Sequence, residues 1–141
     1  DRALHVATHL GRAEHATSGR LAPLGLELAR GEQLLADAVA ALKPRVPFAF
    51  LSACETGEGT FVDAQGLQGL ARALLDAGTR DLLVTLWPVQ DQAARDFALA
   101  FHRELAQGVP PSACAARARA ELRDAGWPSS EWAAFRALGA D

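Results

Sequence analysis

The sequence predicts an α/β domain whose sheet is mostly parallel and is covered by helices on both faces. Short apolar runs at residues 4–8, 48–51 and 82–86 have the length and composition of strands buried inside a parallel sheet. Segments with apolar residues at helical spacing lie between or after these runs. Strands that alternate with helices in this way are typical of βαβ units, which is why the α/β class is expected.

The first half of the chain is expected to hold two buried strands, a loop and one helix. Residues 4–8 form the first strand, residues 10–23 lack any period and form a loop, and 24–28 is compatible with a short strand. A helix is predicted from Gly31 to Leu42, where Pro44 and Pro47 prevent it from continuing. The strand at 48–51 follows, with Cys54 just beyond its carboxyl end.

In the second half, glycines at 57, 59 and 66 predict a loop before a helix that ends at Gly78. After the strand at 82–86, Asp91 is expected to cap a helix that runs to Gln107, and Ser112 another that runs to about Asp124. The tail SSEWAAFRALGAD is compatible with either a helix or an edge strand, and the local pattern does not decide between them.

Length, charge and cysteine content limit the class of protein. The 141 residues, half of them apolar, allow one domain with a substantial core. A net charge of -3 gives no basic field for direct nucleic-acid binding. No apolar run approaches the roughly 18 residues that span a bilayer, and no signal-like segment opens the chain, so no membrane partner and a cytoplasmic location are predicted.

Cysteine usage and overall composition add two expectations. The chain has only two cysteines, in unlike contexts, which favours a reducing compartment over a disulfide scaffold. Cys114 lies in an alanine-rich segment and is interpreted as a helix-packing residue. Abundant alanine, and basic charge carried almost wholly by arginine, are typical of bacteria with GC-rich genomes.

Two of the predicted strands end in residues that can cooperate chemically, His9 and Cys54. Sites in parallel sheets gather at the carboxyl ends of the strands. A thiol becomes a strong nucleophile when a neighbouring imidazole takes its proton or stabilises the thiolate. Cys54 follows His9 by 45 positions, close to the roughly 50 that separate the histidine and cysteine of caspases. The structural alternative is that Cys54 is a small core residue.

Five blocks of the sequence, in order, carry a family resemblance: LHVATH, LSACETGEG, GLARALLDAG, LVTLWPVQD and EWAAFRALG. Together they resemble the CHAT domain, a caspase-like module that is often found with tetratricopeptide repeats and is related to separase. The resemblance implies a caspase-like three-layer sandwich. Because such domains carry further strands before the histidine strand, residues 1–141 are expected to form the carboxyl-terminal part of a larger CHAT domain.

The resemblance also implies cysteine endopeptidase chemistry on a protein or peptide substrate. Cys54 would attack the peptide carbonyl while His9 shuttles the proton, and the backbone amides of Leu10, Gly11 and Cys54 would hold the oxyanion. One position departs from the family pattern, which has glycine after this histidine where this sequence has Leu10. Leucine still offers its backbone amide, but it restricts the backbone conformation.

By the same resemblance, Ser52, Trp87 and Asp91 are assigned to the substrate pocket, where Asp91 would favour a basic residue before the cleaved bond. Asp91 is equally well explained as a helix cap, and Trp87 is interpreted as a core residue or pocket wall in preference to a platform on which a ligand stacks. Glu55 and Thr56 are interpreted as loop-shaping residues. The resemblance further implies a regulatory tetratricopeptide-repeat or other sensor region in the full-length protein.

No metal or cofactor is predicted. His5 and His9 have the spacing of two zinc ligands on a helix, but on a strand they are about 13 Å apart and cannot share one ion. His5 is instead interpreted as a polar residue behind the site, and His102 as a solvent-exposed helix residue. The segment GEGTFVDAQG lacks the lysine followed by a hydroxyl residue that a phosphate-binding loop requires. The rival function is a catalytically inactive, caspase-like interaction module.

Overall fold

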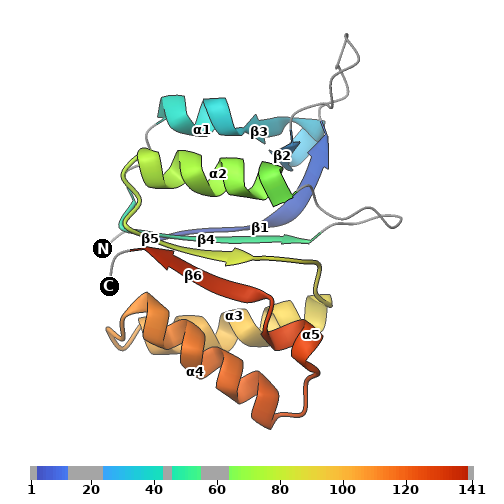
Figure 1. Cartoon of the computed structure of the whole chain (residues 1–141), viewed down its shortest axis with the longest axis vertical. Coiled ribbons are helices and arrows are strands. Elements are labelled where there is room, and N and C mark those ends of the chain that lie inside the picture. Colours follow the sequence, from blue (N-terminus) through green and yellow to red (C-terminus); the bar gives the residue numbers. More distant parts are fainter. Residues whose placement is uncertain (1–2, 13–23, 43–45, 55–63, 140–141) are drawn as a thin grey trace.

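The fold is described from a computed structural model of the chain, shown in Figure 1. The described residues are 3–12, 24–42, 46–54 and 64–139, and for 9–12, 24, 53–54 and 64–68 the description covers the backbone alone. Within these residues a three-layer arrangement is clear, with one sheet between two layers of helices.

Within the described residues, six strands form one sheet in the order β3-β2-β1-β4-β5-β6. Their bounds are β1 Ala3–Arg12, β2 Leu24–Glu27, β3 Gln33–Leu35, β4 Phe48–Cys54, β5 Asp81–Thr85 and β6 Phe135–Gly139. The central strands β1, β4 and β5 pair in parallel, and antiparallel pairing is confined to the two sides of the sheet. Strand β3 runs in the same direction as β1, because β2 is antiparallel to both of them. Most strands of the sheet therefore run the same way, and the predicted fold class is confirmed.

Helices cover both faces of the sheet. Helices α1 (Ala36–Leu42) and α2 (Ala64–Asp76) lie on one face, and α3 (Asp91–Leu105), α4 (Pro111–Asp124) and the short α5 (Ser129–Trp132) lie on the other (Figure 1). A single 3-10 turn, η1 (Ala29–Gly31), precedes β3. Among the described residues, no helix has the length and apolar character needed to cross a bilayer.

Each face of the sheet has its own hydrophobic core. Phenylalanines from β4, β6 and α3 fill the core beneath α3 and α4, where Phe50, Phe97, Phe101 and Phe135 are fully buried. Leucine, valine and alanine side chains fill the core beneath α1 and α2, around Leu51, Leu70 and Leu82. The predicted stripe on α3 is confirmed, because Phe97 and Phe101 recur one helical turn apart on its buried side.

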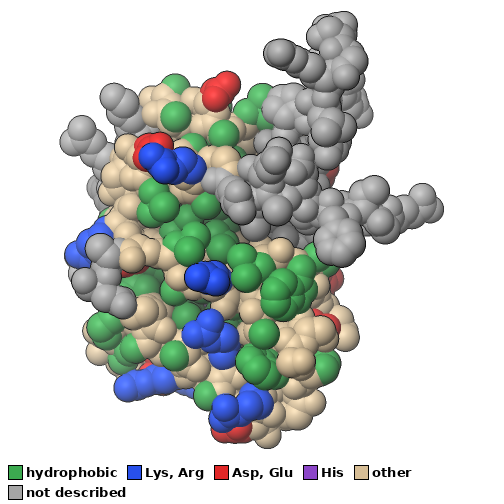
Figure 2. Space-filling view, in the orientation of Figure 1, with side chains coloured by type: hydrophobic (Ala, Val, Ile, Leu, Met, Phe, Trp, Pro, Cys, Tyr) green, Lys and Arg blue, Asp and Glu red, His purple; other side chains and the backbone are tan. Residues whose placement is uncertain are grey.

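The outer edge at β6 has no neighbouring strand among the described residues. Figure 2 shows this side of the molecule, where hydrophobic side chains gather in a band at the level of the sheet and arginine side chains lie below them. The Arg119 guanidinium donates a hydrogen bond to the Phe135 carbonyl oxygen of this edge strand at 3.0 Å. Charged side chains of this kind discourage other chains from pairing with an open edge.

Two boundaries differ from the prediction because strand pairing overrides local propensity. The helix expected from Gly31 begins only at Ala36, since residues 33–35 form β3 and pair with β2. The backbone of Arg30 (φ 68°) and Gly31 (φ 76°) turns the chain into this strand. The loop expected from residue 10 begins later, because Leu10 to Arg12 continue β1 and pair with β2. The strand predicted near residues 24–28 is confirmed as β2.

The predicted caps of α3 and α4 are wrong by one or more positions. Asp91 is the first residue of α3 and Gln90 occupies the cap, and Pro110 rather than Ser112 precedes α4. Neither cap residue makes a side-chain capping bond. The undecided tail contains both structures, a short helix followed by the edge strand β6. Cys114 packs in the α3–α4 core as predicted.

Candidate active site at the carboxyl edge of the sheet

The backbones of His9 and Cys54 lie side by side at the carboxyl edge of the sheet. Strands β1 and β4 pair in parallel from Ala3 opposite Phe48 to His9 opposite Cys54, which is the last pair of the ladder. Neighbouring strands lie about 4.8 Å apart, a distance that a side chain on one strand can span to reach the other. The register therefore joins, at one edge, two residues that are far apart in the chain.

A cavity of about 400 Å³ lies against this part of β1 and β4. Its floor comes from the two strands and its wall from the first half of α3; the lining residues are His5, Ala7, Thr8, Ser52, Asp91, Ala94, Arg95 and Ala98. The helical members lie on one side of α3, because Ala94 and Arg95 follow Asp91 by three and four positions and Ala98 follows them by four and three. Two of the predicted pocket residues, Ser52 and Asp91, thus line the same cavity.

The third predicted pocket residue, Trp87, does not line this cavity. Its side chain is 39% exposed, and its indole Nε1 donates a hydrogen bond to the Ser130 carbonyl oxygen at 2.6 Å. The core interpretation of Trp87 is wrong, because a side chain this exposed is not part of the interior. Trp87 instead ties the connection after β5 to α5.

Charge and polarity are unevenly distributed along the cavity. Asp91 and Arg95, one turn apart on α3, contribute opposite charges, while Ala7, Ala94 and Ala98 contribute small apolar surfaces. The Arg95 guanidinium also approaches the Asp96 carboxylate at 3.6 Å. Ser52 is buried at the floor. A cavity of this kind can accommodate an extended side chain with a charged end. Asp91 would favour a positive charge there, and Arg95 a negative one.

His5, which lines the cavity, forms a pair with His102. Nδ1 of His5, on β1, lies 3.0 Å from Nε2 of His102, on α3. The His5 ring also stacks on Phe50, with 4.3 Å between ring centroids. Burial lowers the pKa of His5, and repulsion from His102 lowers it further; burial likewise lowers the pKa of His102. His102 is therefore not the freely exposed residue that was expected, because its ring packs against His5 of β1.

Within the described part of the chain, other groups that could carry chemistry do not form a rival centre. Among the described residues, no three histidine, cysteine or carboxylate side chains come together as metal ligands. Cys114 is fully buried, and burial raises the pKa of its thiol, so it is a poor nucleophile. The predicted loop-shaping residues Glu55 and Thr56 lie outside the described residues.

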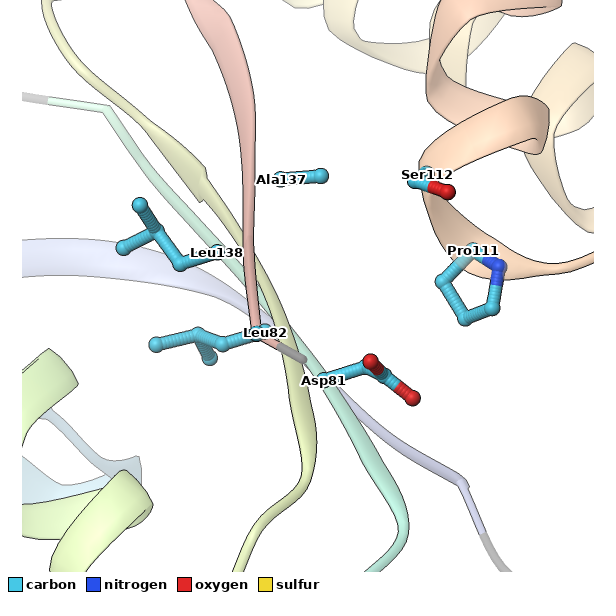
Figure 3. Close-up of a pocket in the computed structure, with 7 residues that line it drawn as sticks. Asp81, Leu82, Pro111, Ser112, Ala137 and Leu138 are labelled. Carbon is cyan, nitrogen blue, oxygen red and sulfur yellow. The ribbon is translucent and has the colours of Figure 1, made fainter. Parts of the chain in front are cut away.

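Two smaller cavities lie away from the His9 and Cys54 edge. One, of about 80 Å³, lies between the start of α4 and the strands β5 and β6; Figure 3 shows Pro111 and Ser112 on one side of it and Asp81 and Ala137 on the other. It lies at the opposite edge of the sheet, where β5 begins, and can hold only a few water molecules. The other, of about 110 Å³, is lined wholly by apolar residues under α1 and α2.

Comparison with known proteins identifies the family. The model of the CHAT domain matches residues 2–140, essentially the whole chain. This chain belongs to the CHAT domain family. The CHAT domain described here is also 36% identical over 102 residues to tetratricopeptide repeat protein 28 of Mus musculus, across 71% of the chain and 4% of that relative. It is 38% identical over 82 residues to tetratricopeptide repeat protein 28 of Homo sapiens, across 57% of the chain and 3% of that relative.

The CHAT domain thus spans only a small part of the length of these relatives. The sequence indicated the positions of His9, Cys54, Ser52 and Asp91, but it gave no sign of Arg95 as a cavity residue. The only local signal for Arg95 is its helical spacing from Asp91, and that spacing has no meaning until the side of α3 that faces β1 is known.

Proposed function

We propose that this CHAT domain is a cysteine endopeptidase that uses His9 and Cys54. The observation that carries the proposal is the parallel register of β1 and β4, which ends with His9 opposite Cys54. Caspase-like family membership supports the same chemistry. Since strand residues alternate between faces, positions 9 and 54 belong to the sheet face of Ala7 and Ser52, both of which line the large cavity.

In the proposed reaction, the Cys54 sulfur bonds to the carbonyl carbon of the peptide. The thiol proton passes to His9, which then donates it to the amine nitrogen as the carbon–nitrogen bond breaks. Water attacks the resulting thioester, and His9 takes a proton from that water. The acid product leaves, and the proton returns to the sulfur. No metal or oxidant is required in this sequence of steps.

The oxyanion is proposed to bind backbone amides of Cys54 and of either Leu10 or Gly11. Both β1 residues pair with the antiparallel strand β2, opposite Leu26 and Gly25. In an antiparallel ladder, successive residues direct their N–H and C=O groups to opposite sides of the strand. Only one of the two amides therefore points toward β2 for hydrogen bonding. The other points toward the β4 side of the strand, immediately after the last pair of the β1–β4 ladder, His9 and Cys54.

We further propose that the large cavity receives the substrate residue that precedes the cleaved bond, and that this residue is basic. Asp91 lines the cavity and supplies the carboxylate that an arginine or lysine side chain would meet. Its position at the start of α3 also places it near the positive end of the helix dipole. Arg95, on the same wall, would oppose acidic side chains.

Control by an attached region is a further part of the proposal. The two relatives are named as tetratricopeptide repeat proteins, and the CHAT domain covers only a few per cent of each. We propose that a repeat or sensor region attached to this domain regulates access to the site. A cytoplasmic location, which would keep the Cys54 thiol reduced, fits the same proposal.

The test is covalent labelling of Cys54 by a peptidyl probe that carries a thiol-reactive group next to an arginine. The wild-type chain should be labelled, whereas Cys54→Ala should not, and His9→Ala should react at least about a hundredfold more slowly because the thiolate is lost. Asp91→Asn should reduce labelling by the arginine probe by about tenfold, and labelling by a matched alanine probe much less.

The controls separate the peptidase from the inactive interaction module. Cys114→Ala should be labelled like the wild type, since that thiol is buried in the α3–α4 core. Equal labelling of the wild type, Cys54→Ala and His9→Ala would refute the peptidase proposal and leave the interaction module. If the wild type and Asp91→Asn prefer the arginine probe over the alanine probe equally, Asp91 does not recognise the basic residue of the substrate.

A further inference from the structure

The connection between β5 and α3 is fixed in place from the far end of the chain. It contains Trp87, and it leads directly into the first turn of α3, which forms one wall of the large cavity. The Leu86 amide donates to the Ala134 carbonyl oxygen at 2.8 Å, and the Trp87 indole donates to the Ser130 carbonyl oxygen. Both acceptors belong to α5 or its immediate continuation. The connection is therefore supported along its length by a short, separate helix.

Glu131, also on α5, holds the end of this connection. One oxygen of its carboxylate accepts a hydrogen bond from the Gln90 backbone amide at 2.8 Å, and the other accepts one from Gln90 Nε2 at 3.3 Å. The residue is only 7% exposed, which is rare for a glutamate outside an ion pair or a functional site. A buried carboxylate that lost these donors would be strongly unfavourable, so the contact constrains both partners.

This contact provides an acceptor for the backbone amide of the residue at the cap position of α3. Gln90 occupies the cap position of α3, and its own side chain makes no capping bond. The carboxylate of Glu131, 41 positions away in the sequence, instead lies at the positive end of the helix dipole. The start of α3 is thereby held to α5 as well as to the sheet. Asp91 follows Gln90 directly and lines the cavity.

We propose that Glu131 is a positioning residue for substrate binding, which acts by fixing the first turn of α3 and hence Asp91. The proposal rests on the peptidase function proposed above. Glu131 makes its hydrogen bonds to the connection before α3, whereas His9 and Cys54 lie on β1 and β4. Loss of Glu131 should therefore weaken recognition of the basic substrate residue and leave the bond-making step nearly unchanged.

The kinetic test measures cleavage of a fluorogenic peptide with arginine before the scissile bond by the wild type, Glu131→Ala and Glu131→Gln. Glu131→Ala should raise KM by about tenfold with kcat within about twofold, because both hydrogen bonds that Gln90 donates to the Glu131 carboxylate are lost. Glu131→Gln keeps an acceptor of the same shape, so it should restore KM to within about threefold of the wild type. A matched peptide with alanine in place of arginine should show little effect of either variant.

Glu121→Ala is the matched control. Glu121 pairs with Arg103 on the exposed surface of α3 and α4 and makes no contact with the connection. Its removal should leave KM and kcat as in the wild type. If Glu131→Ala lowers kcat and leaves KM unchanged, or if Glu131→Gln is as defective as Glu131→Ala, the positioning role is wrong.

A second readout separates this inference from the peptidase proposal. Hydrogen exchange of the Gln90 amide, followed by NMR, should accelerate by at least about tenfold in Glu131→Ala and less in Glu131→Gln. If the wild type does not cleave the peptide but exchange changes as expected, the peptidase proposal fails while the structural support by Glu131 stands. If the wild type cleaves and exchange is unchanged in Glu131→Ala, the inference about Glu131 fails alone.

Discussion

Replacing Phe50 by alanine should destabilise this domain more than any surface change. Phe50 lies in the middle of β4, the strand that leads to Cys54, and it is 0% exposed. Its ring stacks beneath His5, and its centroid lies 5.7 Å from that of Phe101 and 6.1 Å from that of Phe97. The substitution would therefore open a cavity between the sheet and α3.

The size of the effect follows from these contacts. Burial of a phenylalanine side chain contributes roughly 1.5–3 kcal/mol, and the unfilled cavity adds to the loss, so the free energy of unfolding should fall by about 4 kcal/mol. With an m-value of about 2 kcal/mol per molar urea, the unfolding midpoint should fall by about 2 M. Such a loss is a large fraction of the total stability of a typical domain, about 5–15 kcal/mol.

Urea unfolding followed by tryptophan fluorescence is the assay. Leu99→Ala is the matched control, because Leu99 is an apolar residue of α3 that is 57% exposed and should change stability by no more than about 0.5 kcal/mol. A loss below about 1.5 kcal/mol for Phe50→Ala, with an unchanged m-value, would show that the ring does not fill a close-packed core.

Two further predictions concern pH and backbone conformation. Since the pKa values of His5 and His102 are lowered in the fold, the unfolded chain binds protons more readily; stability should be fully present above about pH 6.5 and decline below it. Both rings are partly exposed, so the loss should not exceed about 1 kcal/mol, and the double variant His5→Gln/His102→Gln should lack it in urea titrations at pH 7.5 and 5.5. In thermal unfolding, Gly69→Ala, inside α2 with open space around it, should stabilise by about 0.5–1 kcal/mol. Gly139→Ala should destabilise by roughly 1–3 kcal/mol, because φ is +148° and the added carbon would lie 2.6 Å from the Arg80 carbonyl oxygen; equal effects of the two changes would contradict this explanation.

Local sequence patterns predict much of the fold. The buried strands β4 and β5 appear as short apolar runs, and α3 appears as a stripe of apolar residues at helical spacing. These patterns can be read because burial imposes a period on the residues of a single element. The prediction fails where a neighbour decides the structure. Residues 33–35 follow a helix-like pattern, yet they form β3 because β2 offers them an open edge.

The candidate site is likewise predicted only in part by the sequence. The positions of His9 and Cys54 at the ends of apolar runs are features of the sequence, as is the family resemblance of the surrounding blocks. Their register is not, because the local pattern of each run identifies it as a strand without showing which residue of the other run it faces. Only the packing of β1 and β4 between the two helical layers selects the pairing that ends in His9 and Cys54.

By itself, then, the amino-acid sequence determined most of the buried and helical segments of this CHAT domain and placed His9 and Cys54 at the ends of two apolar runs. The tertiary structure alone decided the contact of His5 with His102, 97 positions apart, and the support of Gln90 by Glu131. The physical reason is that hydrogen bonds between distant residues depend on the position of every element between them. Their free energy is realised only when the whole chain has folded, so it leaves no periodic signal in either segment.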